Sequence, residues 1–163
     1  MALAKLSFVS TTTITQAQEF GFHPGDIVQE WLWDDDVDEG LRRRIEDLTG
    51  EDLVDEDYDS AVDGAIIWWR DGDDEDALAD TIMDASELVD EGAPFWIITP
   101  KPGREGSTNA ATLQSAAKTA GMNAATPLTV SDDWNGVRLR AFGKGAERAD
   151  RMERAERDDM DVR

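Results

Sequence analysis

The first residues that could do chemistry are two cations and two hydroxyls that follow an apolar run. Pro94–Thr99 predicts a buried strand; Lys101 and Arg104 come just after it, and Ser107 and Thr108 open the next predicted helix. In open α/β sheets ligands lie outside the carboxyl ends of strands, and helix amino termini attract anions. These four residues predict a phosphate or carboxylate site. The alternative is a flexible Pro/Gly loop whose cations balance nearby aspartates.

Nucleophilic and acid–base chemistry has little material. The chain contains no cysteine and one histidine, His23. The absence of cysteine removes disulfides, thiolate metal sites and cysteine nucleophiles. His23 lies in a turn before the first predicted strand, where a surface or packing role is expected. We predict no catalytic residue.

A calcium loop is suggested and then rejected by spacing. Asp34, Asp36 and Asp38 begin like an EF-hand, which also needs glycine at its sixth position and glutamate at its twelfth. Here those positions are Glu39 and Ile45. A second acidic run further along fails similarly. No metal site is predicted.

The charge is concentrated in one block. The 163 residues include 37 acidic and 16 basic ones, with a formal net charge of −21, and Asp34–Glu91 holds 24 of the acidic residues and four arginines. Such a field repels nucleic acid and anionic membranes and favours basic partners. We expect no DNA binding and no membrane binding. The block is either a solvated face or a surface for a basic protein partner or cations.

Five of the six tryptophans divide into two groups. Three are predicted in the core: Trp31, Trp68 and Trp96. Trp33 and Trp69 are predicted at strand ends beside acidic residues, where a half-exposed indole can anchor a partner. The predicted partner-contact residues are Trp33, Asp34, Asp35, Asp36, Trp69 and Arg70.

Hydrophobic periodicity predicts alternating strands and helices. The predicted strands are 26–33, 61–69, 94–99, 128–130 and 137–142, with a turn at Asn135-Gly136 before the last. Three helices are predicted. The first starts at a capping box of Asp36 and Glu39 and stops at Gly50, and the other two span 75–91 and 107–120. Strands separated by helices imply right-handed crossovers and an α/β fold with a mixed, mainly parallel sheet.

The chain is predicted to form one domain. Residues 1–17 are expected to be a flexible leader, 18–142 a single α/β domain, and 143–163 a charged tail that is helical or disordered. No apolar run approaches the roughly 20 residues of a membrane span. The start lacks the apolar stretch of a signal peptide, so a cytoplasmic location is expected.

Three segments resemble, in the expected order, a bacterial family of unknown function numbered 3052. They are Phe20-Gly-Phe-His-Pro-Gly-Asp-Ile-Val28, Phe95-Trp-Ile-Ile-Thr-Pro-Lys101 and Asp133-Trp-Asn-Gly-Val-Arg-Leu139. The acidic insert with Trp68-Trp69-Arg70 is similar to the actinobacterial branch. The resemblance implies a reduced Rossmann-like, methyltransferase-like sheet with flanking helices. It implies no established activity.

A methyltransferase of this fold needs a glycine-rich turn after its first strand, so that the backbone can approach the cofactor. Here Trp33–Glu39 contains no glycine and is strongly acidic. We therefore predict no cofactor. The favoured hypothesis is a non-enzymatic interaction or regulatory protein with an acidic surface for a protein partner. The alternative is a degenerate methyltransferase-like enzyme, or a small-anion or nucleotide binder at the Lys101–Thr108 loop. The sequence names neither the partner nor the oligomeric state.

Overall fold

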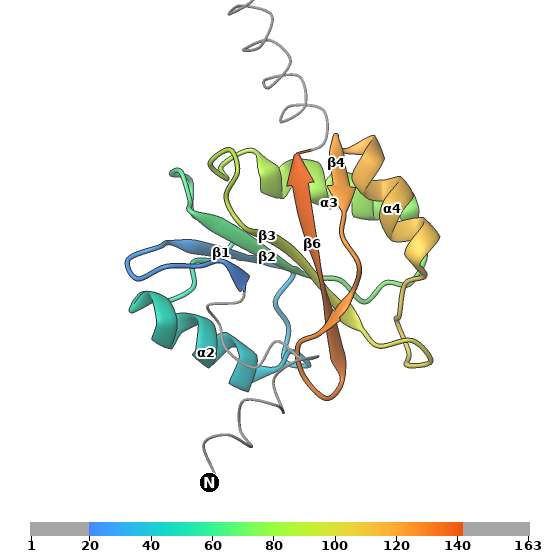
Figure 1. The fold of residues 1–163 in the computed structure, drawn as a ribbon, viewed down its shortest axis with the longest axis horizontal. Helices are drawn as coiled ribbons and strands as arrows, with labels where there is room; N and C mark the ends of the chain where they lie inside the picture. The colour runs from blue at the N-terminus through green and yellow to red at the C-terminus, as the bar shows by residue number, and fades with distance from the viewer. Residues whose placement is uncertain (1–19, 142–163) are drawn as a thin grey trace, which may run out of the picture.

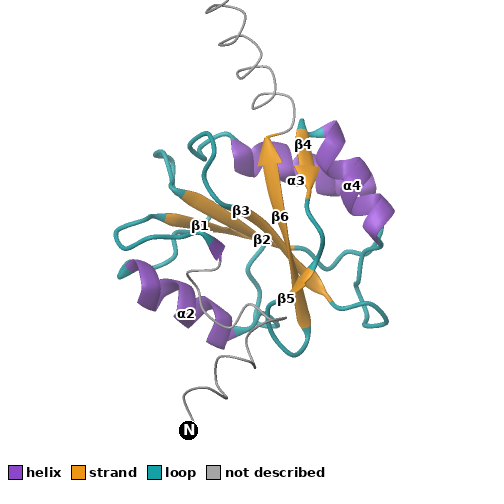
Figure 2. Ribbon diagram, viewed as in Figure 1, coloured by secondary structure: helices purple, strands orange, loops and turns teal. Residues whose placement is uncertain are grey.

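A computed structural model describes residues 20–141 of the chain. Nine elements follow one another along the described residues (Figures 1 and 2). The strands are β1 (Val28–Trp31), β2 (Gly64–Trp68), β3 (Phe95–Pro100), β4 (Met122–Ala124), β5 (Leu128–Thr129) and β6 (Trp134–Ala141). The helices are α2 (Glu39–Thr49), α3 (Glu75–Ser86) and α4 (Ala110–Thr119).

The six strands form one mixed sheet. Its order is β1-β2-β3-β6-β4, and β5 pairs with β6 outside this path. β1, β2 and β3 are parallel, whereas β6 runs antiparallel to both β3 and β4. The predicted α/β class with a mixed sheet is confirmed.

Helices cover both faces of the sheet, as the continuous apolar runs of β2 and β3 require. α3 and α4 pack on one face against Ile67 and Ile97, and α2 packs on the other against Ile66 and Ile98 (Figure 2). Phe20 joins the α2 face, where its ring lies edge-on to that of Trp96 with the centroids 4.9 Å apart. Successive residues of each strand thus enter two separate cores.

The route from β1 to β2 explains why α2 and α3 lie on opposite faces. Two right-handed crossovers in one direction would place both helices on the same face. After α2, however, the chain reaches the outer edge of β1, where Val54 makes a single parallel bridge with Gln29. It then crosses back over the α3 face, where the Gln29 side chain donates to the carbonyls of Asp55 and Tyr58. The chain thus moves outward over the α2 face and returns inward over the α3 face, so both crossovers are right-handed. The Gln29–Val54 bridge stands where a further outer strand would lie.

The limits of α2 differ from the prediction at one end. The carboxylate of Asp38, and not that of Asp36, accepts the Leu41 N–H at 3.0 Å and caps the helix. Gly50 ends it with φ 74°, a left-handed conformation that glycine adopts without strain. The predicted stop is confirmed, and the predicted start is two residues early.

α3 is shorter than the predicted 75–91. It ends at Ser86, because the chain then turns toward the sheet and Val89 forms a parallel bridge with Val62. Val89 therefore lies against the core through a sheet contact and not through a helical turn. Periodicity alone does not separate these two ways of burying the same side chain.

The predicted turn at Asn135-Gly136 is wrong, because both residues lie inside β6. Gly136 has a packing role there, since an added Cβ would lie 2.7 Å from Val130 and 3.3 Å from the ring of Trp96. The prediction also missed β4, whose three residues are too few to show a period. Glycine at this position allows β6 to lie flat against the indole.

Two predictions fall on the ends of the chain. The leader 1–17 and the tail 143–163 lie outside the described residues. Within residues 20–141, none of the helices has the length and apolar character that crossing a bilayer demands.

Candidate functional site

The carboxyl ends of β1 and β2 form the place where an open α/β sheet binds its ligand. From β1 the chain moves outward through α2, and from β2 it moves inward through α3. Adjacent strands whose connections leave in opposite directions define a topological switch point, and ligands bind in the crevice beside it. The loops that follow the two strands therefore decide what this site can hold.

The side chain of Arg70 fills this crevice. Its Nη1 donates to the carbonyl oxygens of Leu32 and Trp68, each at 2.7 Å, and so joins the ends of both strands. Its Nε lies 2.9 Å from the carboxylate of Asp36. The Arg70 guanidinium thus occupies the position at which a ligand would contact the strand ends.

The loop after β1 is also closed by its own contacts. Leu32 has φ 60°, a conformation that favours glycine, and its N–H donates to the Glu56 carboxylate at 2.8 Å. In dinucleotide-binding folds a glycine turn at this place exposes the backbone, and an acidic residue about 20 positions on binds the ribose. Here the backbone N–H and the carboxylate bind each other. The N–H of Leu32 is therefore not available to a cofactor.

A third loop packs on the loop that follows β2. The N–H of Gly72 donates to the Gly106 carbonyl at 3.2 Å, and the Thr108 hydroxyl donates to the Gly72 carbonyl at 2.7 Å. Gly106 has φ 83°, and a Cβ there would collide with the backbone carbonyl of Arg70. The connection after β3 therefore covers the loop that carries Arg70.

Two of the four side chains in the predicted anion site bind other groups of the protein. Arg104 pairs with Asp133 at 2.6 Å, and the Thr108 hydroxyl is bonded as described. The backbone N–H of Ser107 donates to the Arg104 carbonyl. Lys101 lies in the same loop, half-buried, and its backbone N–H donates to the Asp133 carbonyl.

The helix start at this site differs from the prediction. α4 begins at Ala110, and Asn109 is its N-cap, with its side chain accepting the Thr112 N–H at 2.8 Å. The prediction that Ser107 and Thr108 open the helix is therefore wrong. The amino terminus of α4 is capped by a side chain of the protein, which weakens its attraction for an external anion.

The prediction of a half-exposed Trp69 is wrong as well. Trp69 is 1% exposed and packs between the sheet, α3 and α4. Its indole N–H donates to the Gly72 carbonyl at 3.0 Å. Trp31, predicted as core, is partly buried against the same cluster. Arg70 is held inside the crevice, so neither Trp69 nor Arg70 forms an open contact surface.

Trp33 is 51% exposed, a large aromatic surface open to solvent. Asp34, Asp35 and Asp36 follow it and are exposed. The guanidinium carbon of Arg42 lies 6.0 Å from the centroid of the Trp33 ring, at the limit of a cation–π contact. The structure thus leaves an exposed indole with an acidic border, which we call the Trp33 surface (Trp33, Asp34 and Asp35).

A buried ionic network lies beneath the Trp33 surface. Glu30, 5% exposed, accepts from Arg42 Nε at 2.7 Å and Arg42 Nη2 at 2.8 Å. It also accepts from the indole N–H of Trp68 at 2.8 Å. The hydrogen bonds to Glu30 raise the pKa of the Arg42 guanidinium despite its burial. The sequence analysis missed this network, although one carboxylate inside an apolar strand was the signal for it.

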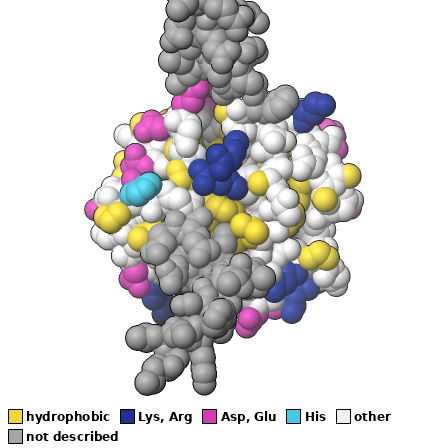
Figure 3. Space-filling model, viewed as in Figure 1, with side chains coloured by type: hydrophobic (Ala, Val, Ile, Leu, Met, Phe, Trp, Pro, Cys, Tyr) yellow, Lys and Arg dark blue, Asp and Glu magenta, His cyan; other side chains and the backbone are white. Residues whose placement is uncertain are grey.

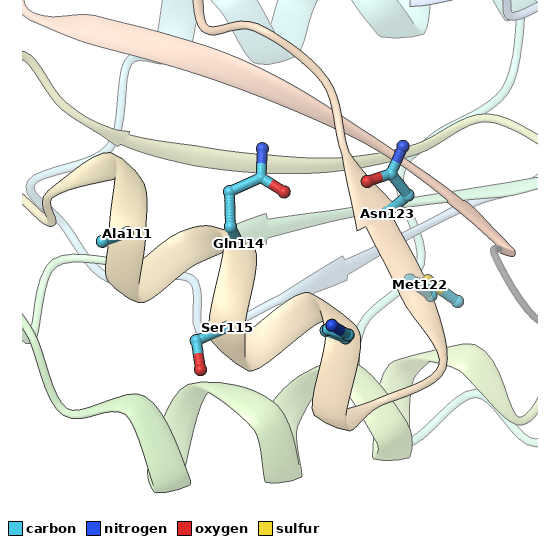
Figure 4. A pocket seen from close by; sticks show the side chains of 6 residues that line it. Ala111, Gln114, Ser115, Met122 and Asn123 are labelled. Carbon is cyan, nitrogen blue, oxygen red and sulfur yellow. The ribbon is translucent and has the colours of Figure 1, made fainter.

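A further hollow of about 520 Å³ lies between α4 and β4 (Figure 4). Gln114 extends from α4 and donates to the Ala124 carbonyl at 2.7 Å, which satisfies part of the free edge of the sheet. The lining residues are Ala111, Gln114, Ser115, Lys118, Met122 and Asn123. They do not combine an acid, a base and a nucleophile. In residues 20–141 no group of three or more His, Cys, Asp or Glu side chains is arranged to hold a metal ion.

Comparison with known proteins agrees with the resemblance. Residues 17–142 match the family described as "Protein of unknown function (DUF3052)". The chain belongs to this family. Uncharacterized proteins of Mycobacterium bovis and Mycobacterium tuberculosis are 38% identical over 123 residues, which cover 76% of this chain and 76% of each relative. Members of the family are therefore found in actinobacteria.

Solved structures that resemble this DUF3052 chain include three methyltransferases. The mitomycin 7-O-methyltransferase MmcR has TM-score 0.45 and 13% identity, covering 61% of this chain and 36% of that one. The O-methyltransferase NcsB1 of neocarzinostatin biosynthesis has TM-score 0.45 and 18% identity, covering 63% and 36%. The chain thus spans 36% of the length of these two enzymes. Magnesium protoporphyrin IX methyltransferase of Synechocystis has TM-score 0.41 and 12% identity, covering 76% and 74%. The expected α/β class is shown by this chain's own structure, a mixed sheet with helices on both faces.

Proposed function

We propose that this DUF3052 protein is a non-enzymatic interaction module whose Trp33 surface binds a basic protein partner. One observation carries the proposal. Arg70 closes the crevice between β1 and β2, while Trp33 beside it remains 51% exposed. The place of a cofactor is filled by the protein itself, and a large aromatic side chain is left in water.

The closed crevice argues against a catalytic role for the switch point. A ligand there would have to displace Arg70 from two carbonyl oxygens and from Asp36. The released carbonyls would then need new donors, because an unpaired buried polar group costs about 1–3 kcal/mol. The Leu32–Glu56 hydrogen bond would also have to break before the backbone could contact a cofactor.

The Trp33 surface has the features of a binding anchor. Tryptophan is enriched among residues that dominate binding energy, since it buries a large rigid area at little entropic cost. The acidic side chains around it, together with the net charge of −21, attract a basic partner and accelerate association. Glu30 holds in place Arg42 on α2, whose guanidinium carbon lies 6.0 Å from the centroid of the Trp33 ring.

The test compares partner capture by three versions of the full chain. Trp33→Ala/Asp34→Asn/Asp35→Asn removes the anchor and two charges. The matched control is Met83→Ala/Asp80→Asn/Asp84→Asn on α3, which removes one exposed hydrophobic side chain and two exposed aspartates elsewhere. Each version is used to capture proteins from the native lysate at several salt concentrations, and the bound proteins are identified by mass spectrometry.

We expect a set of basic proteins that the native chain and the α3 control retain and that the Trp33 variant loses. Their retention decreases as salt rises, because exposed charges are screened. A captured set that is identical for all three versions would contradict the proposal. Hydrogen exchange of a purified complex gives a second readout, with protection expected in residues 32–38.

A further inference from the structure

A second concave site lies at the opposite end of the sheet, beside the amino ends of β1, β2 and β3. It is a hollow of about 490 Å³. Its charged lining consists of four carboxylates and one guanidinium, from Asp26, Asp63, Asp90, Glu91 and Arg138. In the view of Figure 3, Lys and Arg side chains lie near the middle of the face, and several acidic side chains lie to their left.

Arg138 is the unusual member of this lining. It comes from β6, and its Nε is buried without a hydrogen-bond partner in residues 20–141. Burial, with a smaller contribution from the nearby Arg140, lowers the pKa of the Arg138 guanidinium. A buried donor that makes no hydrogen bond costs free energy. Within the described chain, Arg42, Arg70 and Arg104 each form an ion pair with a carboxylate.

The backbone next to Arg138 leaves room for the guanidinium. Gly21 has φ 91°, and a Cβ added there would lie 3.1 Å from Arg138 Nη1 and 3.1 Å from Pro94. A larger residue at position 21 would therefore push the guanidinium away. The site combines a space that glycine keeps open with a donor that lacks a partner.

Two carboxylates of the lining accept hydrogen bonds from the backbone. The Asp26 carboxylate accepts the His23 N–H at 2.8 Å, and the Asp63 carboxylate accepts the Ile27 N–H at 2.9 Å. These bonds fix each side chain while leaving further acceptor positions on both carboxylates. Asp26 and Asp63 are thus preorganised acceptors, and together with Asp90 they exceed Arg138 in charge.

We propose that this hollow binds a free basic amino acid, with its carboxylate on Arg138 and its cationic groups on the acidic wall. A planar carboxylate is the group that an arginine fork binds best. A simple anion would be repelled by the four acidic side chains, and a simple cation would leave Arg138 without a partner. A ligand with one carboxylate and two cationic groups matches both. This site is at the other end of the sheet from the Trp33 surface and does not depend on it.

The test is isothermal titration of the full chain with L-arginine and L-lysine, and with L-argininamide, in which the carboxylate is absent. We expect a dissociation constant of about 1 mM or tighter for at least one of the two amino acids. The amide is expected to bind about tenfold or more weakly, because it lacks the charge-assisted bonds to Arg138. Asp90→Asn should weaken binding as well.

Arg138→Gln is expected to weaken binding of the amino acid about tenfold to a hundredfold. The matched control is Arg140→Gln, which removes the same charge two residues along β6 from an exposed side chain outside the lining; its binding should stay within about twofold of the native value. A urea unfolding curve of each variant without ligand checks that it folds, and Arg138→Gln should be at least as stable as the native chain.

Three results would overturn the proposal. The first is the absence of binding heat for both amino acids in the native chain. The second is equal binding of L-arginine and L-argininamide. The third is binding that Arg138→Gln and Arg140→Gln reduce to the same extent, because ordinary charge screening on a surface would then account for it.

Discussion

Replacing Glu30 by leucine removes a buried carboxylate that serves three donor atoms. Glu30 accepts from Arg42 Nε, Arg42 Nη2 and Trp68 Nε1, at 2.7, 2.8 and 2.8 Å. It joins β1 to α2 and to β2, so its loss affects three elements of the α2 core. Leucine has a similar volume, which limits the contribution of a cavity.

The expected cost follows from the burial of the two partners. Breaking a buried ion pair by removing one partner costs about 3–5 kcal/mol, and an unsatisfied indole N–H costs about 1–3 kcal/mol. The side chain of Arg42 is 21% exposed, so water can rehydrate part of the guanidinium. We therefore expect a loss at the low end, about 3 kcal/mol. This is a large part of the roughly 5–15 kcal/mol that stabilises a domain.

The measurement is urea unfolding followed by tryptophan fluorescence, with the free energy of unfolding obtained by linear extrapolation. Glu39→Leu is the control, because Glu39 bonds the same guanidinium at 2.8 Å from a side chain that is 50% exposed. It should cost about 1 kcal/mol or less. The double variant Glu30→Leu/Arg42→Leu should cost less than the sum of the two single changes, since no buried charge remains.

The reasoning would be refuted if Glu30→Leu and Glu39→Leu lowered the free energy of unfolding by amounts within about 0.5 kcal/mol of each other. Burial would then have no part in the strength of the network. Strict additivity of Glu30→Leu and Arg42→Leu would lead to the same conclusion, because a double-mutant cycle detects the interaction as a departure from additivity.

Three other outcomes are expected. Arg70→Ala should lower the free energy of unfolding by about 2 kcal/mol, because two carbonyls lose their donor. S-adenosylmethionine should not raise the melting temperature of the native chain, and a clear rise would indicate that the crevice binds a cofactor. Gly136→Ala should cost about 1–3 kcal/mol by overpacking against Trp96, and an unchanged urea midpoint would contradict that packing. Acrylamide should quench Trp33 far more than Trp69, so Trp33→Phe should remove much of the quenchable emission while Trp69→Phe leaves it.

The sequence predicted those features that depend on residues close together in the chain. The apolar runs of β2 and β3 require cover on both faces, and they have it. The stop of α2 at Gly50 depends on one residue that tolerates a left-handed backbone. The exposed position of Trp33 among acidic residues was also predicted, because it depends on the neighbouring residues and not on a contact with a distant one.

Pairing between distant residues escaped prediction. Trp69 was expected at the surface, yet it is buried because α3 and α4 both pack over that end of β2. Asp36 was expected to be a helix cap and part of an open surface, but its carboxylate binds Arg70, which follows β2. Nothing in the residues near Asp36 indicates this partner.

The sequence by itself determined the order of the strands and helices other than β4, the acidic block and the absence of a glycine turn, because these depend on residue type and short spacing. The tertiary structure decided which charges meet. Glu30 and Trp68 are 38 positions apart along the chain, and their contact exists only because β1 and β2 are paired in one register. The same pairing places Arg70 across the crevice, while β6 places Arg138 in a hollow without a partner among the described residues.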